Sequence, residues 1–335
     1  MSKKVCLTGI KPTGMPHLGN YVGAIKPAIE LAANDEYEGL YFIADYHALI
    51  GVHDAKKLNN DIYEVAASWI ASGLNTKTST LYLQSQIPEI LELSWILNCF
   101  TAKGLMNRAH AYKAKVQINA EEKRDPDYDV SMGLYSYPVL MAADILFASA
   151  NIVPVGSDQI QHVEIARDIA STFNNKYGEI LTLPEAFVQD ESKIIPGLDG
   201  RKMSKSYNNH IPIFLPEKKL RKMIMKITTD SRAPEEPKEP EGTIIDLYKL
   251  FASESESKEL SARYKTGIGW GEAKQELFEK INQHIAPKRD YYDELMQDTS
   301  KIDVILKDGT ERIRPRAIKL LEEIKQAIGV SLRSY

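Results

Sequence analysis

The sequence predicts an α/β fold with a Rossmann-like, doubly wound parallel sheet and a C-terminal all-helical domain. Short apolar runs alternate with helical patterns through the first half of the chain, which is typical of a parallel sheet. A glycine-rich turn directly follows the first apolar run, and residues 244–296 contain helical patterns only. We therefore expect a sheet domain at 1–207, a helical domain at 208–300, and a last helix in 301–335 that packs back near the sheet.

Length and composition describe an ordinary water-soluble chain. With 335 residues it exceeds one typical core, so two domains are expected. The net charge of −4 means that any contact with nucleic acid must come from local basic patches. Cys6 and Cys99 lack the spacing of a zinc or disulfide framework, which suits a reducing, cytoplasmic location. No signal peptide is expected, and Pro138 and Asp144 interrupt the most apolar stretch, which excludes a membrane span.

Periodicity places the individual elements. Strands are expected at residues 4–9, 40–44, 80–84 and 151–155, and helices at 20–33, 54–73, 88–97, 135–148 and 161–173. Residues 103–128 form a basic helical stretch with a charged loop at its end, and 233–242 form a proline- and glutamate-rich linker or surface loop. Further helices are expected at 215–226, 245–250, 256–264, 272–285, 288–296 and 311–328.

The first candidate site is the turn between the first strand and the first helix. This order of elements points backbone N–H groups and a helix N-terminus at a phosphate, although neither GxGxxG nor the Walker pattern occurs. His17 and Asn20 lie about one helical turn apart, on either side of Gly19. Both side chains could therefore contact one anion while the glycine leaves room for a flat ring. A surface histidine on a plain strand–turn–helix explains the tetrapeptide alone equally well.

The second candidate site is the pentapeptide Lys202-Met203-Ser204-Lys205-Ser206. Two lysines and two small hydroxyls form a mobile cationic loop suited to a polyphosphate whose charge shifts during a reaction. Taken alone, such a pentapeptide is more often a solvated loop.

Asp144 is the third candidate, because a lone carboxylate within an apolar helix needs a partner. That partner is an arginine, solvent on an exposed face, or a substrate.

Four motifs in this order resemble one family. The turn HLGN, the strings YPVLMAADIL (137–146) and VPVGSDQIQH (153–162), and the loop KMSKS are similar to those of bacterial-type tryptophanyl-tRNA synthetases, within the class I aminoacyl-tRNA synthetases. The resemblance runs from residue 5 to about residue 232. It implies ATP-dependent activation of L-tryptophan to tryptophanyl-adenylate and pyrophosphate, with ATP and Mg²⁺, followed by transfer to tRNA(Trp). It also implies a homodimer.

The resemblance further implies roles for individual residues. Asp144 would accept a hydrogen bond from the indole N–H, which suits a donor-only ring nitrogen. The remaining tryptophan-binding residues would be Tyr137, Met141, Val153, Val155 and His47. The catalytic residues would be His17, Asn20, Lys202 and Lys205. The ATP-binding residues would be Lys11, Pro12, Thr13, Gly19, Asn20, Gly156, Ser157, Asp158, Gln159, Ile194 and Met203.

Some of these roles remain open. Asp158 is suited either to a ribose hydroxyl or to capping the next helix. No protein metal site is expected, since Mg²⁺ would bridge ATP phosphates. Lys11 stands where many relatives have glutamine, and we hypothesise that it lowers the dependence on Mg²⁺. Ser157 stands where most have glutamate, which leaves one polar contact open.

Two basic clusters indicate contacts with a phosphate backbone. One lies within 215–226, and the other comprises Arg312, Arg314, Arg316 and Lys319.

Three rival functions remain. A tyrosyl-tRNA synthetase shares the architecture but needs polar groups for a phenol. A nucleotidylyltransferase would be shorter and would lack KMSKS, and a non-catalytic paralogue would bind tRNA or amino acid without activity.

Overall fold

The computed structural model describes residues 3–188 and 195–331, apart from the side chain of Asp158. Within these residues a parallel sheet contains β1 (Lys4–Ile10), β2 (Tyr37–Ile43), β3 (Thr80–Leu83), β4 (Ile152–Val155) and β5 (Glu185–Val188), in the order β3-β2-β1-β4-β5. This is a doubly wound sheet, and the direction of winding changes between β1 and β4. The predicted fold class is therefore confirmed.

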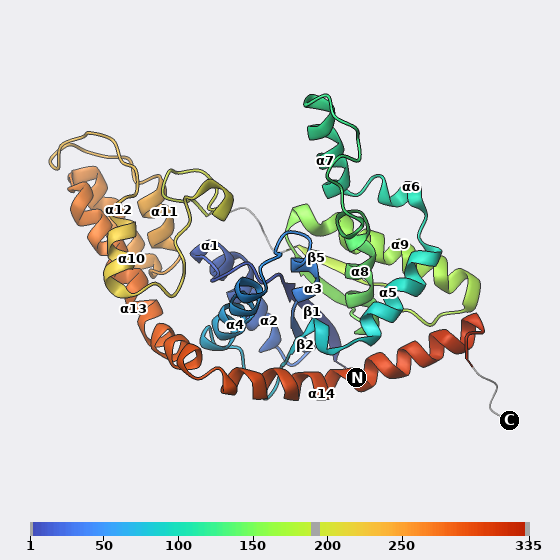
Figure 1. Ribbon diagram of the computed structural model, residues 1–335. Helices are drawn as coiled ribbons and strands as arrows, with labels where there is room; N and C mark the ends of the chain where they lie inside the picture. The colour runs from blue at the N-terminus through green and yellow to red at the C-terminus, as the bar shows by residue number, and fades with distance from the viewer. Residues whose placement is uncertain (1–2, 189–194, 332–335) are drawn as a thin grey trace.

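Helices connect the strands and extend the chain beyond the sheet (Figure 1). The first part contains α1 (Leu18–Asn20), the π-helix η1 (Tyr21–Ile25), α2 (Lys26–Ala32), α3 (Asp45–Ala48), α4 (Ala55–Ala71), η2 (Gln84–Gln86), α5 (Glu89–Phe100), α6 (Lys103–Met106), α7 (His110–Glu121), α8 (Met132–Phe147), η3 (Ser157–Gln159) and α9 (Ile160–Tyr177). The second contains η4 (Lys205–Tyr207), α10 (Glu217–Ile224), α11 (Thr243–Lys249), α12 (Glu254–Thr266), α13 (Trp270–Gln297) and α14 (Ser300–Ile328). None of the helices in the described residues is long and apolar enough to cross a membrane.

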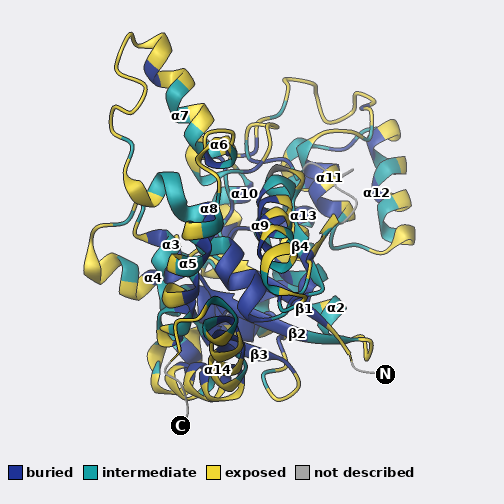
Figure 2. Ribbon diagram, turned by 90° about the vertical axis from the view of Figure 1, so that its right-hand side faces the viewer, coloured by how far each residue is buried: buried dark blue, intermediate teal, exposed yellow. Residues whose placement is uncertain are grey.

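Two apolar cores cover the two faces of the sheet. One contains side chains of α2, α4 and α10–α13 together with the aromatic pair Tyr41 and Trp69. The other contains side chains of α5, α8 and α9, with Phe147 and Phe173 fully buried. Strands β1, β2 and β3 are mostly buried between these layers, as Figure 2 shows. This burial explains why these three strands appear as near-continuous apolar runs in the sequence.

Helix α14 runs along the sheet and contributes to both cores (Figure 1). It is longer than the predicted helix 311–328, since it begins at Ser300 and contains Pro315. Its arginines bind carboxylates of the sheet domain: Arg316 contacts Glu38 at 2.8 Å, and Arg314 contacts Glu89 at 2.9 Å. The prediction that this basic cluster contacts a phosphate backbone is therefore wrong for these two side chains, which tie α14 to the sheet.

Local structure differs from the prediction at two further places. The edge strand β5 was not predicted. Helix α13 is continuous through Pro287 instead of being two helices, 272–285 and 288–296.

Residues 233–242, predicted as a linker or surface loop, form a mostly exposed loop without regular structure. The loop is attached to α12, because the Lys238 N–H donates to Tyr264 O at 2.7 Å. The Nζ of the buried Lys238 donates within the loop, to Ala233 O at 2.7 Å and Glu236 O at 2.9 Å.

The contact between α14 and β3 gives a prediction about stability. A Cβ atom at Gly309 would lie 1.8 Å from the carbonyl oxygen of Leu81, so α14 packs there directly on strand backbone. We expect Gly309→Ala to lower the free energy of unfolding by about 3 kcal/mol, because backbone cannot move aside as a flexible side chain does. Urea denaturation measures this. The control Gly271→Ala, in α13 with no atom within 4 Å, should be neutral or slightly stabilising. Equal unfolding free energies for the two variants would contradict this packing.

Candidate active site

The predicted site residues gather at the carboxyl ends of neighbouring strands. The turn 11–17 follows β1, His47 lies on α3 after β2, and Gly156–Gln159 follow β4. Gln84, which follows β3 directly, was not predicted. In an open α/β sheet a ligand binds at this edge, where the winding changes direction. The sheet thus brings the candidate amino-acid and nucleotide residues into one region.

The turn His17–Asn20 is held by its own side chains. His17 caps α1: its Nδ1 accepts a hydrogen bond from the Asn20 N–H at 3.2 Å, and Asn20 Oδ1 accepts from the His17 N–H at 3.2 Å. These two atoms are therefore used within the turn. The groups that remain for a ligand are the Nε2–H of His17 and the amide NH₂ of Asn20.

His17 is buried, and its protonation state follows from its surroundings. Burial, together with His210 and Lys205 nearby, lowers the pKa of His17 to about 4. The imidazole is therefore neutral at physiological pH. Because Nδ1 accepts the Asn20 N–H, the single ring proton lies on Nε2, and His17 is a neutral hydrogen-bond donor.

Backbone pairing joins the signature turn to the segment that follows the cationic loop. The Leu18 N–H donates to Ile211 O at 2.9 Å, and the Ile213 N–H donates to Pro16 O at 3.0 Å. Lys205, on the loop itself, donates from Nζ to Thr13 O at 2.7 Å and to Gly14 O at 3.0 Å. The turn and the loop, distant in sequence, therefore lie in contact with one another.

Gly19 lies where the turn meets the loop. A Cβ atom on Gly19 would lie 2.9 Å from His17 Nδ1 and 3.5 Å from Met203 Cβ. Any larger side chain would therefore enter the space between the two signatures. Met203 itself is buried, whereas the side chain of Lys202 is exposed.

Lys205 is half-buried, and burial lowers its pKa, with Lys57 acting in the same direction. The carboxylates of Asp61 and Glu64 oppose this change. The lysine thus faces acidic groups on α4 and the carbonyls of the turn. Lys205 Nζ therefore lies beside the turn, where the carbonyl oxygens of Thr13 and Gly14 accept its hydrogen bonds.

Asn209 closes the cationic loop and was not predicted. Its Oδ1 accepts from the Ser204 N–H at 2.8 Å, and its Nδ2 donates to Asp199 Oδ1 at 2.7 Å. His210 follows directly, with its ring centroid 5.9 Å from that of His17. Burial lowers the pKa of His210, as does Lys205. Because Asn and His are common in polar loops, no sequence pattern distinguished these two residues.

Asp144 is fully buried on α8 and has two side-chain donors. Gln84 Nε2 donates to its two oxygens at 2.8 and 2.9 Å, and His47 Nε2 lies 2.9 Å from Oδ2. These partners differ from the arginine considered as the structural alternative. Burial raises the pKa of Asp144, whereas the hydrogen bond from His47 opposes this rise. The position of Gln84 at the end of a strand is the feature of the sequence that could have predicted it as a site residue.

A second polar chain lies beside this carboxylate. The Tyr137 hydroxyl is 2.5 Å from His162 Nε2, and His162 Nδ1 is 2.9 Å from Gln159 Oε1. The ring of His47 packs edge-on against Tyr137, with centroids 6.3 Å apart. This contact joins the group around Asp144 to the residues after β4. His162 is buried and was not predicted as a site residue.

The other predicted residues are distributed around these two groups. Met141 and Val155 are half-buried, and Val153 is buried in the core beside them. In the turn, Lys11 and Thr13 are exposed and Pro12 is buried. Gly156 and Ser157 lie at the carboxyl end of β4. Ile194 and the side chain of Asp158 lie outside the described residues.

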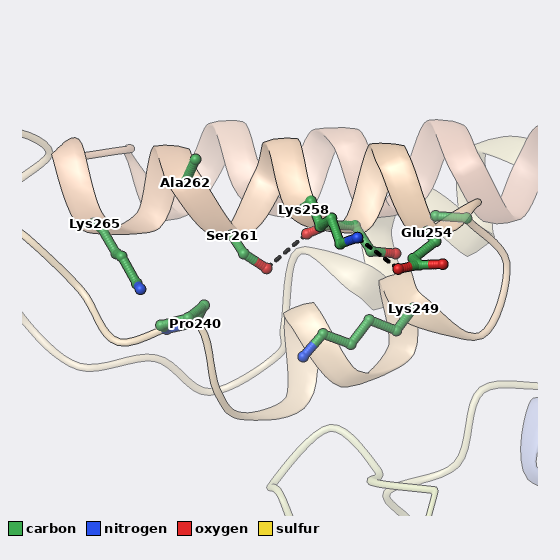
Figure 3. A pocket seen from close by; sticks show the side chains of 9 residues that line it. Pro240, Lys249, Glu254, Lys258, Ser261, Ala262 and Lys265 are labelled. Carbon is green, nitrogen blue, oxygen red and sulfur yellow. Dashed lines mark hydrogen bonds and ion pairs between the residues drawn. The ribbon is translucent and has the colours of Figure 1, made fainter.

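Among the residues that the structure describes, no group of three His, Cys, Asp or Glu side chains could hold a metal ion. An open groove of about 620 Å³ lies elsewhere, between α11 and α12 (Figure 3). It is lined by Pro240, Lys249, Ala252, Glu254, Ser257, Lys258, Ser261, Ala262 and Lys265.

This chain is similar to known proteins over nearly its whole length. The family described as tRNA synthetases class I (W and Y) matches residues 2–286. A Tryptophan--tRNA ligase from Neisseria meningitidis is 51% identical over 332 residues, covering 98% of this chain and 99% of that protein. One from Pseudomonas aeruginosa is 49% identical, covering 98% of this chain and 74% of that protein.

Solved structures are similar as well. The tryptophanyl-tRNA synthetase from Campylobacter jejuni, crystallised with ADP and tryptophan, has a TM-score of 0.89 and 45% identity, covering 97% of this chain and 99% of that chain. A tyrosyl-tRNA synthetase from Archaeoglobus fulgidus, at 19% identity and a TM-score of 0.64, shares the fold. With the loop residue Lys205 bonded to the signature turn and a family match over most of its length, this chain belongs to the class I tRNA synthetases of the tryptophan and tyrosine family.

Proposed function

We propose that this chain activates L-tryptophan with ATP and transfers the tryptophanyl group to the 3′ end of tRNA(Trp). The observation that carries the proposal is Asp144, a fully buried carboxylate oriented by Gln84 and His47 within an apolar helix. The relatives with about half of their residues identical are named as tryptophan–tRNA ligases, which supports the same substrates here.

Asp144 suits tryptophan because the indole nitrogen is a donor only and an ionised carboxylate is an acceptor only. Gln84 and His47 occupy part of the acceptor capacity of the two oxygens and hold the carboxylate in one orientation. An amino acid without this N–H, such as phenylalanine, leaves the buried acceptor unpaired. Sites of this kind reject such analogues by roughly 10⁴–10⁵. Tyr137, Met141, Val153 and Val155 would surround the ring.

The first step is attack of the tryptophan carboxylate on the α-phosphate of ATP, which releases pyrophosphate. This nucleophile is ionised at neutral pH, so the step needs no general base. Catalysis then consists of positioning and of stabilising the charge that develops on the phosphates. In this proposal the Nε2–H of His17 and the amide of Asn20 donate to phosphate oxygens, and Lys202 and Lys205 follow the leaving pyrophosphate.

The remaining ATP contacts come from the turn and from the residues after β4. Gly19 admits the adenine, and backbone at Met203 contacts it. Lys11, Pro12 and Thr13 lie along the phosphates, and Gly156, Ser157, Asp158 and Gln159 lie along the ribose. Mg²⁺ would enter with ATP as part of the substrate and would offset negative charge on its phosphates. The effect of Lys11 on the Mg²⁺ dependence stays a prediction.

For tRNA we propose the helical part, residues 208–300, as the binding domain. Helix α10 supports this assignment, since Lys218, Lys219 and Lys222 on it are exposed. Such side chains contact phosphates and position a nucleic acid without reading its sequence. Because tRNA charging serves translation, we place this activity in the cytoplasm.

We also propose that two copies of the chain form a homodimer through α5. On this helix Leu91 and Trp95 are one turn apart, and their exposed fractions are 41% and 72%. An exposed tryptophan beside an exposed leucine is unusual on a free surface and typical of an interface core. Met132, at the start of the neighbouring helix α8, is 75% exposed.

ATP–pyrophosphate exchange tests the substrate. Exchange should depend on tryptophan, while tyrosine and phenylalanine support a rate lower by about 10⁴. Asp144→Asn should lower kcat/KM for tryptophan by about 10²-fold and leave the KM for ATP unchanged, because the indole N–H, Gln84 and His47 lose a charged acceptor while the turn and the cationic loop keep their contacts.

The exposed Asp293→Asn variant is the matched control and should behave as the unmodified chain does. Thermal melting monitored by circular dichroism checks that both variants fold. Exchange driven by tyrosine would overturn the tryptophan assignment. Full tryptophan affinity in the absence of any exchange would favour the non-catalytic paralogue.

Trp95→Asp tests the dimer. A charge at this position should oppose burial of the α5 face, so the variant should sediment as a monomer at concentrations where the unmodified chain is a dimer. Val304→Asp, on α14 and 68% exposed, is the control and should not change the mass. An unchanged sedimentation coefficient for the Trp95 variant would exclude α5 as the interface.

A further inference from the structure

A closed hydrogen-bonded cluster connects the signature turn to helix α13. The hydroxyl of Tyr21 lies 2.8 Å from His284 Nε2 and accepts from Lys288 Nζ at 2.7 Å. Lys288 Nζ also lies 2.9 Å from His284 Nε2. Each of the three groups therefore contacts the other two. Tyr21 is buried, and the other two side chains are half-buried.

The directions of these hydrogen bonds follow from charge. An ammonium group has donors only, so Lys288 donates to the tyrosine oxygen, and the tyrosine proton is left for His284. His284 Nε2 then accepts, which requires a neutral ring. Burial, Lys288 and Lys26 lower the pKa of His284 to about 4, in agreement with this state. The Lys288 ammonium also lies over the face of the Tyr21 ring, 5.1 Å from its centroid.

Tyr21 directly follows the turn that contains His17 and Asn20. Its N–H donates to His17 O at 3.0 Å, and its carbonyl accepts from the Lys26 N–H in the π-helical turn η1. Pro27 lacks an N–H, so the ordinary helical bond to the carbonyl of Gly23 cannot form there. Short π-helical turns of this kind occur frequently at functional sites. Because the Tyr21 N–H is bonded to His17 O, the position of Tyr21 is coupled to the capped turn His17–Asn20.

The partners of Tyr21 lie on either side of a proline. His284 and Lys288 are one helical turn apart on α13, and Pro287 lies between them. Proline removes the hydrogen bond to residue 283 and weakens the helix at this point. Helix α13 runs from the helical part toward α14, as Figure 1 shows. The cluster therefore fastens α13, at the point where Pro287 removes a helical hydrogen bond, to the residue that directly follows the signature turn.

We propose that Tyr21, His284 and Lys288 are positioning residues for adenylate formation. In this role the cluster holds the backbone of residues 17–20 so that the Nε2–H of His17 and the amide of Asn20 remain at the phosphate-binding position. None of the three side chains contacts the reacting atoms. The inference rests on the proposed function, since it assigns a role within the same reaction.

This role differs from simple packing in what it predicts for kinetics. Displacement of donors that act on developing charge lowers kcat, because a shift of 1 Å can cost about 10²-fold in rate. Binding of tryptophan depends on α8 and the residues after β4, so its KM should be insensitive. A purely structural cluster would instead lower the fraction of folded protein and leave the kinetics of the folded fraction unchanged.

The experiment uses Tyr21→Phe, Lys288→Met and the double variant of the full chain. Tyr21→Phe retains the ring and removes only the hydroxyl. Each single variant should lower kcat for tryptophan-dependent ATP–pyrophosphate exchange by about tenfold, with KM for tryptophan changed less than twofold. The double variant should lose no more than either single variant, because the three groups act as one unit. Lys280→Met, on the same helix and paired with Glu256, is the control and should retain full activity.

Two results would overturn the inference: an unchanged kcat in Tyr21→Phe, or losses that multiply to about 10²-fold in the double variant. Hydrogen–deuterium exchange of the unliganded chain gives a readout independent of activity. Amides of residues 17–25 should exchange about tenfold faster in Tyr21→Phe than in the unmodified chain, and unchanged protection would also overturn the inference. If the unmodified chain shows no exchange activity with any amino acid, the proposed function fails, and the deuterium experiment still decides the role of the cluster.

Discussion

The backbone pairing between residues 16–18 and 211–213 is the contact on which the rest of the site depends. Two N–H···O bonds join the signature turn to the segment that follows the cationic loop. Because backbone groups form these bonds, they fix the relative position of the two segments independently of flexible lysine side chains. Asn209 then closes the loop beside this pairing, and Lys205 reaches back to the carbonyls of the turn. The turn and the cationic loop are therefore held together by protein contacts alone.

Charge is distributed unequally between the signature turn and the cationic loop. His17 is neutral, with a pKa of about 4, and donates without carrying charge, whereas Lys202 and Lys205 on the loop carry the positive charge. Two protonated imidazoles beside Lys205 would repel it and one another, and the lowered pKa values of His17 and His210 avoid this. The cationic groups thus lie on the loop, the side that can follow a departing pyrophosphate, while the capped turn holds its position.

The alternation of apolar runs and helices was sufficient to predict the parallel sheet, because each buried strand is a continuous apolar run. The four motifs likewise identified the turn, the loop and Asp144. Gln84 was missed because its contact with Asp144 arises only when β3 lies beside β2 and α8 crosses their ends. The arginines of α14 were misinterpreted for a similar reason, since a charge pattern does not reveal that Glu38 and Glu89 face it from the sheet. The edge strand β5 is short and mostly exposed, so it lacks the apolar run that predicts the others.

Helices α13 and α14 follow one another in the chain and connect the helical part to the sheet domain. Helix α13 contributes to the same core as α4, α10 and α11, and α14 continues under the sheet to Leu81 and Glu38. Both helices contain an internal proline, at 287 and 315, and each lies beside side chains bonded to the sheet domain. At Pro287 these are His284 and Lys288, bonded to Tyr21, and at Pro315 they are Arg314 and Arg316, bonded to carboxylates. A missing helical bond is tolerated where side chains anchor the helix on both sides of it. Because of the same arrangement, any movement of α13 relative to the sheet domain would strain the hydrogen bonds of Tyr21, the residue that follows the signature turn.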